Sequence, residues 1–167
     1  EIIICPVGSS ATLAGLTIGC QLAGMNTVVR GIRVAPAYLG PFPACTASSV
    51  LSLMMKTQRY LEKRDVSVSG DWNRPTLNDE YYGEGYGIAT SCGEQAQASM
   101  LLHGIELEQT YTAKAAAAFY DTLRDHQGDC LYWHTFNSQN MEKQAEQAST
   151  EDFPEELRQF LFLTSKK

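Results

Sequence analysis

Hydrophobic residues open the chain in one unbroken run, Ile2-Ile3-Ile4-Cys5-Pro6-Val7. A run this rich in β-branched residues predicts a buried strand. Small residues follow, and from Thr12 to Ala23 large apolar residues recur between Ala and Gly: Leu13, Leu16, Ile18 and Leu22. This pattern predicts a helix that ends at Gly24 and is buried over most of its surface.

Later segments repeat the alternation between strand and helix patterns. Strands are predicted over 27–34 and 130–133, with a short apolar stretch at 105–107. Helical spacing covers 46–63, 91–103 and a stretch from 112 to just before Gly128. A loop with three prolines spans 36–43, and an irregular stretch rich in Gly, Asn, Asp and Tyr spans 67–90.

Strands that alternate with helices predict an α/β fold, with an open, mostly parallel sheet flanked by helices. The 167 residues leave room for one domain with a real core. We assign residues 1–137 to this α/β domain. Residues 138–167 form a C-terminal polar segment that ends in a helix over 153–163, with Pro154 in its first turn.

Composition narrows the possible partners. A net charge of −6 with scattered Lys and Arg argues against a nucleic-acid surface. No apolar run is long enough for a membrane span. The five cysteines are widely spaced and form no ligand cluster with histidine, which predicts reduced thiols in a cytoplasmic protein without a zinc site. Because the chain lacks an initiator Met and enters a strand at once, we expect it to be a piece of a longer protein.

The first strand-to-helix connection, Gly8 to Thr12, is a candidate anion site. A strand, a small-residue loop and a helix N-terminus together present free backbone N–H groups. It is not a P-loop, because Leu13 and Ala14 occupy the places of the second Gly and the Lys. The dinucleotide-binding pattern fails at Ser10. An ordinary strand–helix turn remains the alternative.

Other polar residues also fall at the carboxyl ends of predicted strands, where open α/β sheets bind ligands. They are Tyr111-Thr112 and His134-Thr135. The alternative for each Thr is simple helix capping. Tyr86, in the glycine-rich loop, either packs against the fold or directs its phenol into a cleft. Lys114 is interpreted as solvated or paired.

Four stretches in series resemble the C-terminal half of the pyridoxal-phosphate fold type II enzymes of the 1-aminocyclopropane-1-carboxylate deaminase and D-cysteine desulfhydrase family. Their order and approximate spacing agree from Ile2 to about Asn137. The stretches are Val7–Leu16, Tyr82–Gly87, Leu107–Lys114 and Leu131–Thr135.

The resemblance implies a role for each matched position. Backbone amides of the first loop would hold the phosphate of pyridoxal 5'-phosphate: Gly8, Ser9, Ser10, Ala11 and Thr12. Tyr86 and Tyr111 would be the catalytic residues, facing the substrate as proton-handling or leaving-group contacts. Thr112 and Thr135 would lie near the pyridine nitrogen. The complete protein would be a homodimer that acts on a small amino acid.

Thr112 favours one activity within the family. The deaminase branch carries Glu here, and a carboxylate favours a protonated, strongly electron-withdrawing pyridinium. Thr cannot supply that charge, but a weaker electron sink suffices to eliminate a good leaving group such as thiolate. D-cysteine desulfhydrase-like β-elimination is therefore preferred over deamination of 1-aminocyclopropane-1-carboxylate.

The chain also departs from the family. Phe136-Asn137 and Ser10-Ala11 each replace a glycine pair, which raises a non-catalytic pseudoenzyme or binding domain as an alternative. A Rossmann-like domain for another phosphorylated ligand is a third. The family's Schiff-base lysine lies in the N-terminal half, and no lysine here matches its motif: Lys56, Lys63, Lys114, Lys143, Lys166 and Lys167. We expect this chain alone to be inactive.

Overall fold

The computed structural model of the chain describes residues 1–68, 72, 75–136, 147, 149, 151, 153–155, 157 and 158. The chain forms two compact units, Glu1–Phe136 and Asn137–Lys167. The predicted polar segment and C-terminal helix lie largely outside the described residues.

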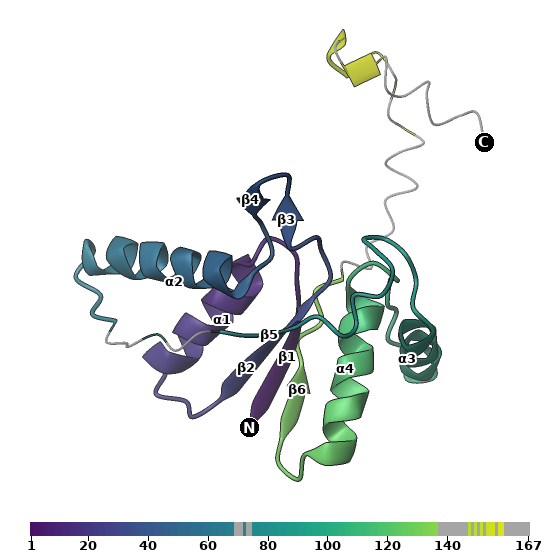
Figure 1. The fold of residues 1–167 in the computed structure, drawn as a ribbon, viewed down its shortest axis with the longest axis horizontal. Helices are drawn as coiled ribbons and strands as arrows, with labels where there is room; N and C mark the ends of the chain where they lie inside the picture. The colour runs from purple at the N-terminus through teal and green to yellow at the C-terminus, as the bar shows by residue number, and fades with distance from the viewer. Residues whose placement is uncertain are drawn as a thin grey trace. The chain divides into compact units, whose positions relative to one another are not determined.

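A four-stranded parallel sheet forms the centre of the first unit (Figure 1). Its strands are β1 (Ile2–Val7), β2 (Val28–Arg33), β5 (Thr76–Asn78) and β6 (Cys130–Tyr132), in the order β5-β2-β1-β6. β1 pairs in parallel with β2 and β6, and β2 pairs in parallel with β5. The predicted open, mostly parallel α/β sheet is confirmed.

The side chains of β1 alternate between two hydrophobic cores, as the period of a strand requires. Ile3, Cys5 and Val7 pack with α1 (Ala11–Leu22) and α2 (Ala47–Glu62). Ile2 and Ile4 pack with the alanines of α4 (Thr112–Asp125). α1 and α4 therefore cover opposite faces of the sheet. α2 packs on α1, and α3 (Ser91–Leu101) packs on α4 (Figure 1).

Small side chains bring α4 close to both of its neighbours. Every residue from Thr112 to Ala118 is buried, and five of these seven are alanines. Ala115 and Ala118 face the sheet, whereas Ala113, Ala116 and Ala117 face α3. A helix with such a row of alanines can approach two surfaces at once, since no long side chain separates the backbones.

Three local expectations need correction. Residues 36–43 form a hairpin of β3 (Tyr38–Leu39) and β4 (Phe42–Pro43), not a plain loop. β5 was not predicted, because three residues with a polar residue at each end carry too short a pattern. The 105–107 stretch is not a strand. It is a loop held by Gln97, whose side-chain amide donates to the Leu107 carbonyl.

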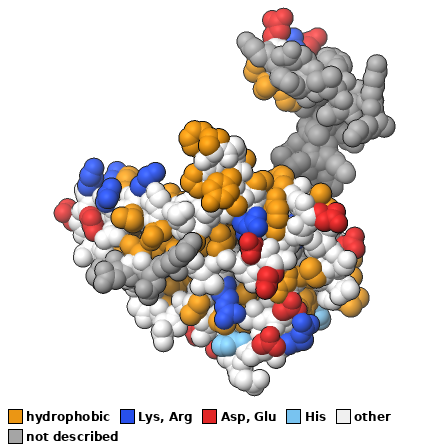
Figure 2. Space-filling model, in the orientation of Figure 1, with side chains coloured by type: hydrophobic (Ala, Val, Ile, Leu, Met, Phe, Trp, Pro, Cys, Tyr) orange, Lys and Arg blue, Asp and Glu red, His pale blue; other side chains and the backbone are white. Residues whose placement is uncertain are grey.

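Helix α1 is also less buried than its composition predicts. Its inward face consists of Leu13, Ala14, Ile18 and Cys20, while Leu22 is 47% exposed. Hydrophobic side chains also gather on the projecting β3–β4 hairpin (Figure 2), where Tyr38, Leu39 and Phe42 are exposed. All five cysteines are free thiols. Among the described helices, none combines the length and apolarity that a membrane crossing demands.

Candidate functional site

The loop from Gly8 to Ser10 leaves the carboxyl end of β1 and leads into α1. Ser10 takes a left-handed backbone conformation, with φ 70° and ψ −11°. This conformation strains residues that carry a Cβ atom. The Ser10 side chain is buried, and its Oγ has no hydrogen-bond partner. A buried hydroxyl without a partner is unfavourable, so this atom marks a position where a polar group is expected.

The N-terminus of α1 differs from those of the other three helices described. α2 is capped by a reciprocal capping box between Thr46 and Ser49, and Thr90 caps α3 by accepting from the Gly93 amide. The first turn of α4 is satisfied by the Glu108 carboxylate. Ser10 makes no such bond to α1, whose first turn also lacks an acidic residue. The amides at the start of α1, including those of Ala11 and Thr12, are therefore open to an external anion.

A hollow of about 400 Å³ opens beside this loop. Ser9 and Ser10 form one wall, and the end of the hairpin with one side of α2 forms the other. The remaining lining residues are Pro43, Ala44, Ser48, Ser49, Ser52, Leu53 and Lys56. Serine hydroxyls and one amine thus surround a space that can accommodate a phosphate ester.

Tyr111 closes the opposite side of the loop. A Cβ atom built on Gly8 would lie 2.8 Å from Tyr111 Cε1, so only glycine fits beneath this ring. Tyr111 is the N-cap residue of α4. Its contact with Gly8 therefore places the first turn of α4 directly against the β1–α1 loop. The structure thus brings two of the predicted site segments together.

Tyr86 and Tyr111 form a hydroxyl pair. Their Oη atoms lie 2.9 Å apart, and the rings meet edge to face with centroids 5.9 Å apart. The hydrogen bond to Tyr86, followed by burial, raises the pKa of Tyr111 to about 12. Tyr111 therefore keeps its proton at neutral pH. Tyr86 is 52% exposed, so the pair is accessible from solvent. Such a pair can donate a proton to a bound group and receive it back.

Thr112 is buried at the start of α4, where its side chain bonds to Glu108. The Glu108 amide donates to Thr112 Oγ1 at 2.8 Å, and Thr112 Oγ1 lies 3.2 Å from Glu108 Oε1. The same carboxylate accepts the amides of Thr110, Tyr111 and Thr112 at 2.7–2.8 Å. A negative charge therefore stands at this helix end, next to the hydroxyl that the resemblance places near the pyridine nitrogen.

Thr135 lies just beyond β6, the strand next to β1, and is exposed. Its neighbour His134 makes a 3.0 Å hydrogen bond through Nε2 to the Glu106 carbonyl. Thr135 therefore shares the carboxyl edge of the sheet with the Gly8–Thr12 loop, as predicted from topology. The role of each of these residues stays a prediction.

Lys114, which the sequence predicts to be solvated or paired, is paired inside the protein and not solvated. It is fully buried, and its Nζ donates to the carbonyls of Tyr82 and Gly85. Burial is also the main cause that lowers its pKa. A signal for this was present: Lys114 stands among Ala113 and Ala115–Ala118, a row of small residues typical of a helix covered on several sides.

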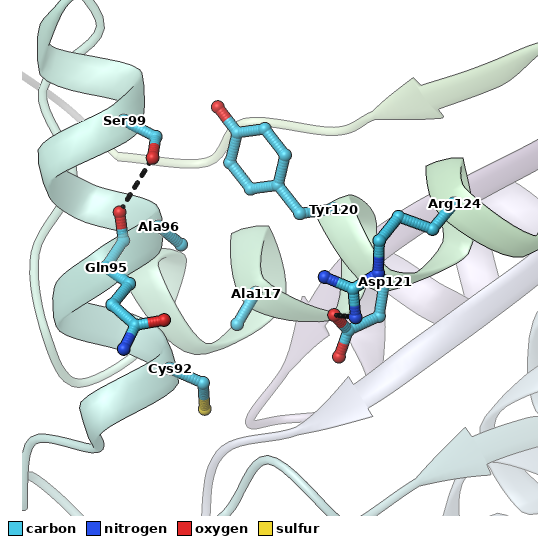
Figure 3. A pocket seen from close by; sticks show the side chains of 8 residues that line it. All are labelled: Cys92, Gln95, Ala96, Ser99, Ala117, Tyr120, Asp121 and Arg124. Atoms are coloured by element: carbon cyan, nitrogen blue, oxygen red, sulfur yellow. Dashed lines mark hydrogen bonds and ion pairs between the residues drawn. The ribbon is translucent and has the colours of Figure 1, made fainter.

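A second hollow, of about 250 Å³, lies between α3 and α4 (Figure 3). It is lined by Cys92, Gln95, Ala96, Ser99, Ala117, Tyr120, Asp121 and Arg124. Its charges are already satisfied, because Asp121 pairs with Arg124 and accepts the Tyr81 hydroxyl at 2.7 Å. In the described part of the chain, no group of His, Cys, Asp and Glu residues could hold a metal ion.

The fold and site define an α/β protein whose candidate site lies at the carboxyl end of a parallel sheet. No protein-family model matches the chain. A Thermotoga maritima protein named "Putative 1-aminocyclopropane-1-carboxylate deaminase" is 26% identical over 136 residues, which are 81% of this chain and 40% of that protein. A crystal structure of an ACC deaminase homologue superposes with a TM-score of 0.63 at 27% identity, covering 79% of this chain and 38% of that one.

These similarities show homology, at low identity, to 1-aminocyclopropane-1-carboxylate deaminase-like proteins. The predicted relationship is confirmed at this level, together with the fold. The chain spans about two fifths of the length of the relatives it matches.

Proposed function

We propose that this chain contributes the phosphate-binding loop and a tyrosine pair to a pyridoxal 5'-phosphate-dependent enzyme that acts on a small amino acid. The observation that carries the proposal is the start of α1. Its amides are uncapped, and beside them the buried Ser10 Oγ lacks a partner. A phosphate dianion satisfies both kinds of donor and is favoured by the helix dipole.

The residues present fit the cofactor. Gly8, Ser9, Ser10, Ala11 and Thr12 would hold its phosphate through backbone amides, with the Ser10 hydroxyl as a further donor. The left-handed φ of Ser10 supports this assignment, because glycine, which the resemblance places at this position in the family, is the residue that adopts such a φ without strain. When bound, the cofactor supplies the electron sink for bonds broken at the substrate's α-carbon.

The chain's own contribution to catalysis would be proton handling. Tyr111 is protonated at neutral pH, and its hydroxyl is fixed by Tyr86 at 2.9 Å. We infer that Tyr111 Oη donates a proton to a leaving group, while Tyr86 Oη exchanges protons with solvent from its exposed side. The ring of Tyr111 also shields the loop at Gly8.

We propose further that the lysine that bonds to the cofactor comes from a segment outside this chain. The described lysines offer poor candidates. Lys114 is buried with its amine bonded to two carbonyls, and Lys63 caps the far end of α2. Lys56 lines the hollow beside the phosphate-binding loop but does not match the family's lysine motif. The matched relatives are more than twice as long as the aligned region, which supports a contribution from elsewhere.

Two reactions compete for this site. Thr112 favours β-elimination from D-cysteine, because its hydroxyl carries no charge to stabilise a pyridinium. The Glu108 carboxylate, 3.2 Å from Thr112 Oγ1, favours the stronger electron sink used in deamination of 1-aminocyclopropane-1-carboxylate. The names of the relatives also favour deamination. We retain the desulfhydrase-like reaction as the first candidate and deamination as the second.

The test uses the complete protein. Incubation with pyridoxal 5'-phosphate should produce a visible absorbance band, and D-cysteine should then yield sulfide, pyruvate and ammonia. Release of 2-oxobutanoate and ammonia from 1-aminocyclopropane-1-carboxylate would select the second reaction. A complete protein that stays colourless contradicts the proposal. Tighter binding of nucleotides than of the cofactor would favour a different phosphorylated ligand.

A matched pair of variants isolates the loop. Ser10→Asp places a carboxylate at the uncapped N-terminus of α1, where it can accept the amides itself. It should weaken cofactor binding at least about tenfold, or ~1.4 kcal/mol, without unfolding the protein. Ser91→Asp, on the exposed first turn of α3, adds the same charge outside the hollow beside the loop. Equal effects of the two variants would contradict the assignment of the loop.

A further inference from the structure

Lys114 is a buried cation that the proposed chemistry does not use. Its side chain is 0% exposed and is the largest of the fully buried side chains among the described residues. A buried ammonium is strongly unfavourable unless polar groups replace the water it has lost. The alanines that flank it on α4 provide no such group. Its partners must therefore come from another segment.

Both partners belong to one short loop. Lys114 Nζ donates to the Tyr82 carbonyl at 2.7 Å and to the Gly85 carbonyl at 3.0 Å. The Tyr82 ring also lies near the amine, with its centroid 5.3 Å from Nζ. One ammonium thus bridges two carbonyls that are three residues apart, which fixes the curvature of the loop between them.

The rest of the loop is built around this contact. Gly83 and Gly87 have left-handed φ angles of 69° and 75°, and a Cβ atom on Gly83 would lie 2.5 Å from Thr90 Cγ2. The Tyr82 ring is additionally held by Arg33, whose Cζ lies 4.3 Å from the ring centroid. The loop is therefore held from several directions.

This loop conformation places Tyr86 next to Tyr111. Tyr86 directly follows Gly85, and its hydroxyl meets that of Tyr111 at 2.9 Å. Tyr111 and Lys114 are three residues apart at the start of α4, so they project from the same side of the helix. The loop is thus attached to a single helical turn at two places, through an ammonium and through a hydroxyl pair.

We propose that Lys114 is the positioning residue of the tyrosine pair. By holding the Tyr82 and Gly85 carbonyls, its ammonium places the Tyr86 hydroxyl against the Tyr111 hydroxyl. The value of this placement for turnover rests on the proposed function above. The attachment itself belongs to the protein without cofactor and can be measured there.

Hydrogen exchange of the complete protein without cofactor provides the first test. Lys114→Met keeps the length of the side chain but removes its donors. It should speed exchange of the Tyr82 and Ile88 amides, which donate to the Asp79 and Gly85 carbonyls, at least tenfold. Amides of β1 and β2 should keep their protection. Lys63→Met removes an exposed lysine and should leave the loop unchanged. A folded Lys114→Met protein with normal protection of the Tyr82 and Ile88 amides would overturn the proposal.

Chemical rescue separates the ammonium from mere packing. Lys114→Ala leaves a space lined by the two carbonyls, and added propylammonium should restore slow exchange of the Tyr82 and Ile88 amides. Propanol, which has a similar shape but no charge, should not. Equal effects of the amine and the alcohol would overturn the proposal. Lys114→Met should respond to neither, because its side chain fills the space.

If Lys114→Met and Lys114→Ala do not fold, a variant that retains the charge still tests the proposal. Lys114→Arg keeps a buried cation but places a larger, planar group beneath the loop. If Lys114 acts through Tyr86, this substitution lowers kcat of the complete protein at least tenfold with a smaller change in KM. In a Tyr86→Phe background it should have little further effect. Full additivity would overturn the proposal, whereas an inactive wild-type protein would contradict only the proposed function.

Discussion

The ring of Tyr111 lies directly over Gly8, so close that a Cβ atom on Gly8 would stand 2.8 Å from Tyr111 Cε1. Gly8 directly follows β1, and Tyr111 is the N-cap residue of α4, more than one hundred residues later in the chain. This contact joins the loop expected to bind phosphate to the helix that carries Tyr111, Thr112 and Lys114.

Substitution of Gly8 by Ala should force the ring away. We expect a loss of about 1–3 kcal/mol in the free energy of unfolding, the range typical of overpacking, measured by urea denaturation. In a Tyr111→Ala background the same substitution should cost much less, because the obstructing ring is gone. An equal cost in both backgrounds would show that another contact is responsible.

Ser10→Gly should stabilise the protein in the absence of ligand. Glycine adopts the φ of 70° without strain, and the change removes a buried hydroxyl that has no partner. The expected gain is about 1 kcal/mol in the free energy of unfolding. Ser9→Gly is the control, because Ser9 is exposed and lacks a positive φ, so it should be neutral or slightly destabilising. A loss of stability in Ser10→Gly would contradict this account of the loop.

Glu108→Gln should weaken the start of α4. The carboxylate accepts three backbone amides there, and a neutral amide with one acceptor oxygen replaces it poorly. We expect a loss of about 1–2 kcal/mol in the free energy of unfolding, together with faster hydrogen exchange at residues 110–113. Glu106→Gln, at an exposed position two residues earlier, should change neither quantity.

Stability should fall as the pH rises above 9. Burial raises the pKa of the Cys5 thiol from 9.0 to about 12, so between these values the unfolded thiol ionises while the folded one cannot. The free energy of unfolding then decreases by up to ~1.4 kcal/mol per pH unit from this group. Burial also raises the pKa of Cys45 and Cys130, which act in the same direction. The lowered pKa of Lys114 acts in the opposite direction.

Urea unfolding between pH 7 and 11 measures this effect. The Cys5→Ala variant should show a shallower decline above pH 9 than the wild type, whatever its stability at pH 7. Parallel declines would mean that Cys5 does not contribute.

Much of the fold is predictable from local patterns. The strand over 2–7 and the helices over 46–63 and 91–103 are long and strongly patterned, and the structure has them within a few residues. β5 and the hairpin of Tyr38 and Phe42 are too short for periodicity to show. Each of these short strands forms because another strand pairs with it, β2 with β5 and β3 with β4. The local sequence of a short strand does not reveal such a partner.

The candidate site also has a part that the sequence predicts and a part that it does not. Topology predicted that Gly8, Tyr111 and Thr135 would share one edge of the sheet. It could not predict that Ser10 is left without a partner, since that depends on which other polar atoms reach it. Lys114 was missed for a related reason: its acceptors are backbone carbonyls of a distant loop, and every residue type carries such carbonyls.

The alanines of α4 have one more consequence. The residues that follow Lys114 are four consecutive alanines, and they set how near the helix axis lies to the sheet on one side and to α3 on the other. Any larger side chain there would hold α4 farther from the sheet or from α3. It would lift the whole helix and tilt Tyr111 off Gly8. The depth of the candidate site is therefore governed by a stretch of helix that no ligand would touch.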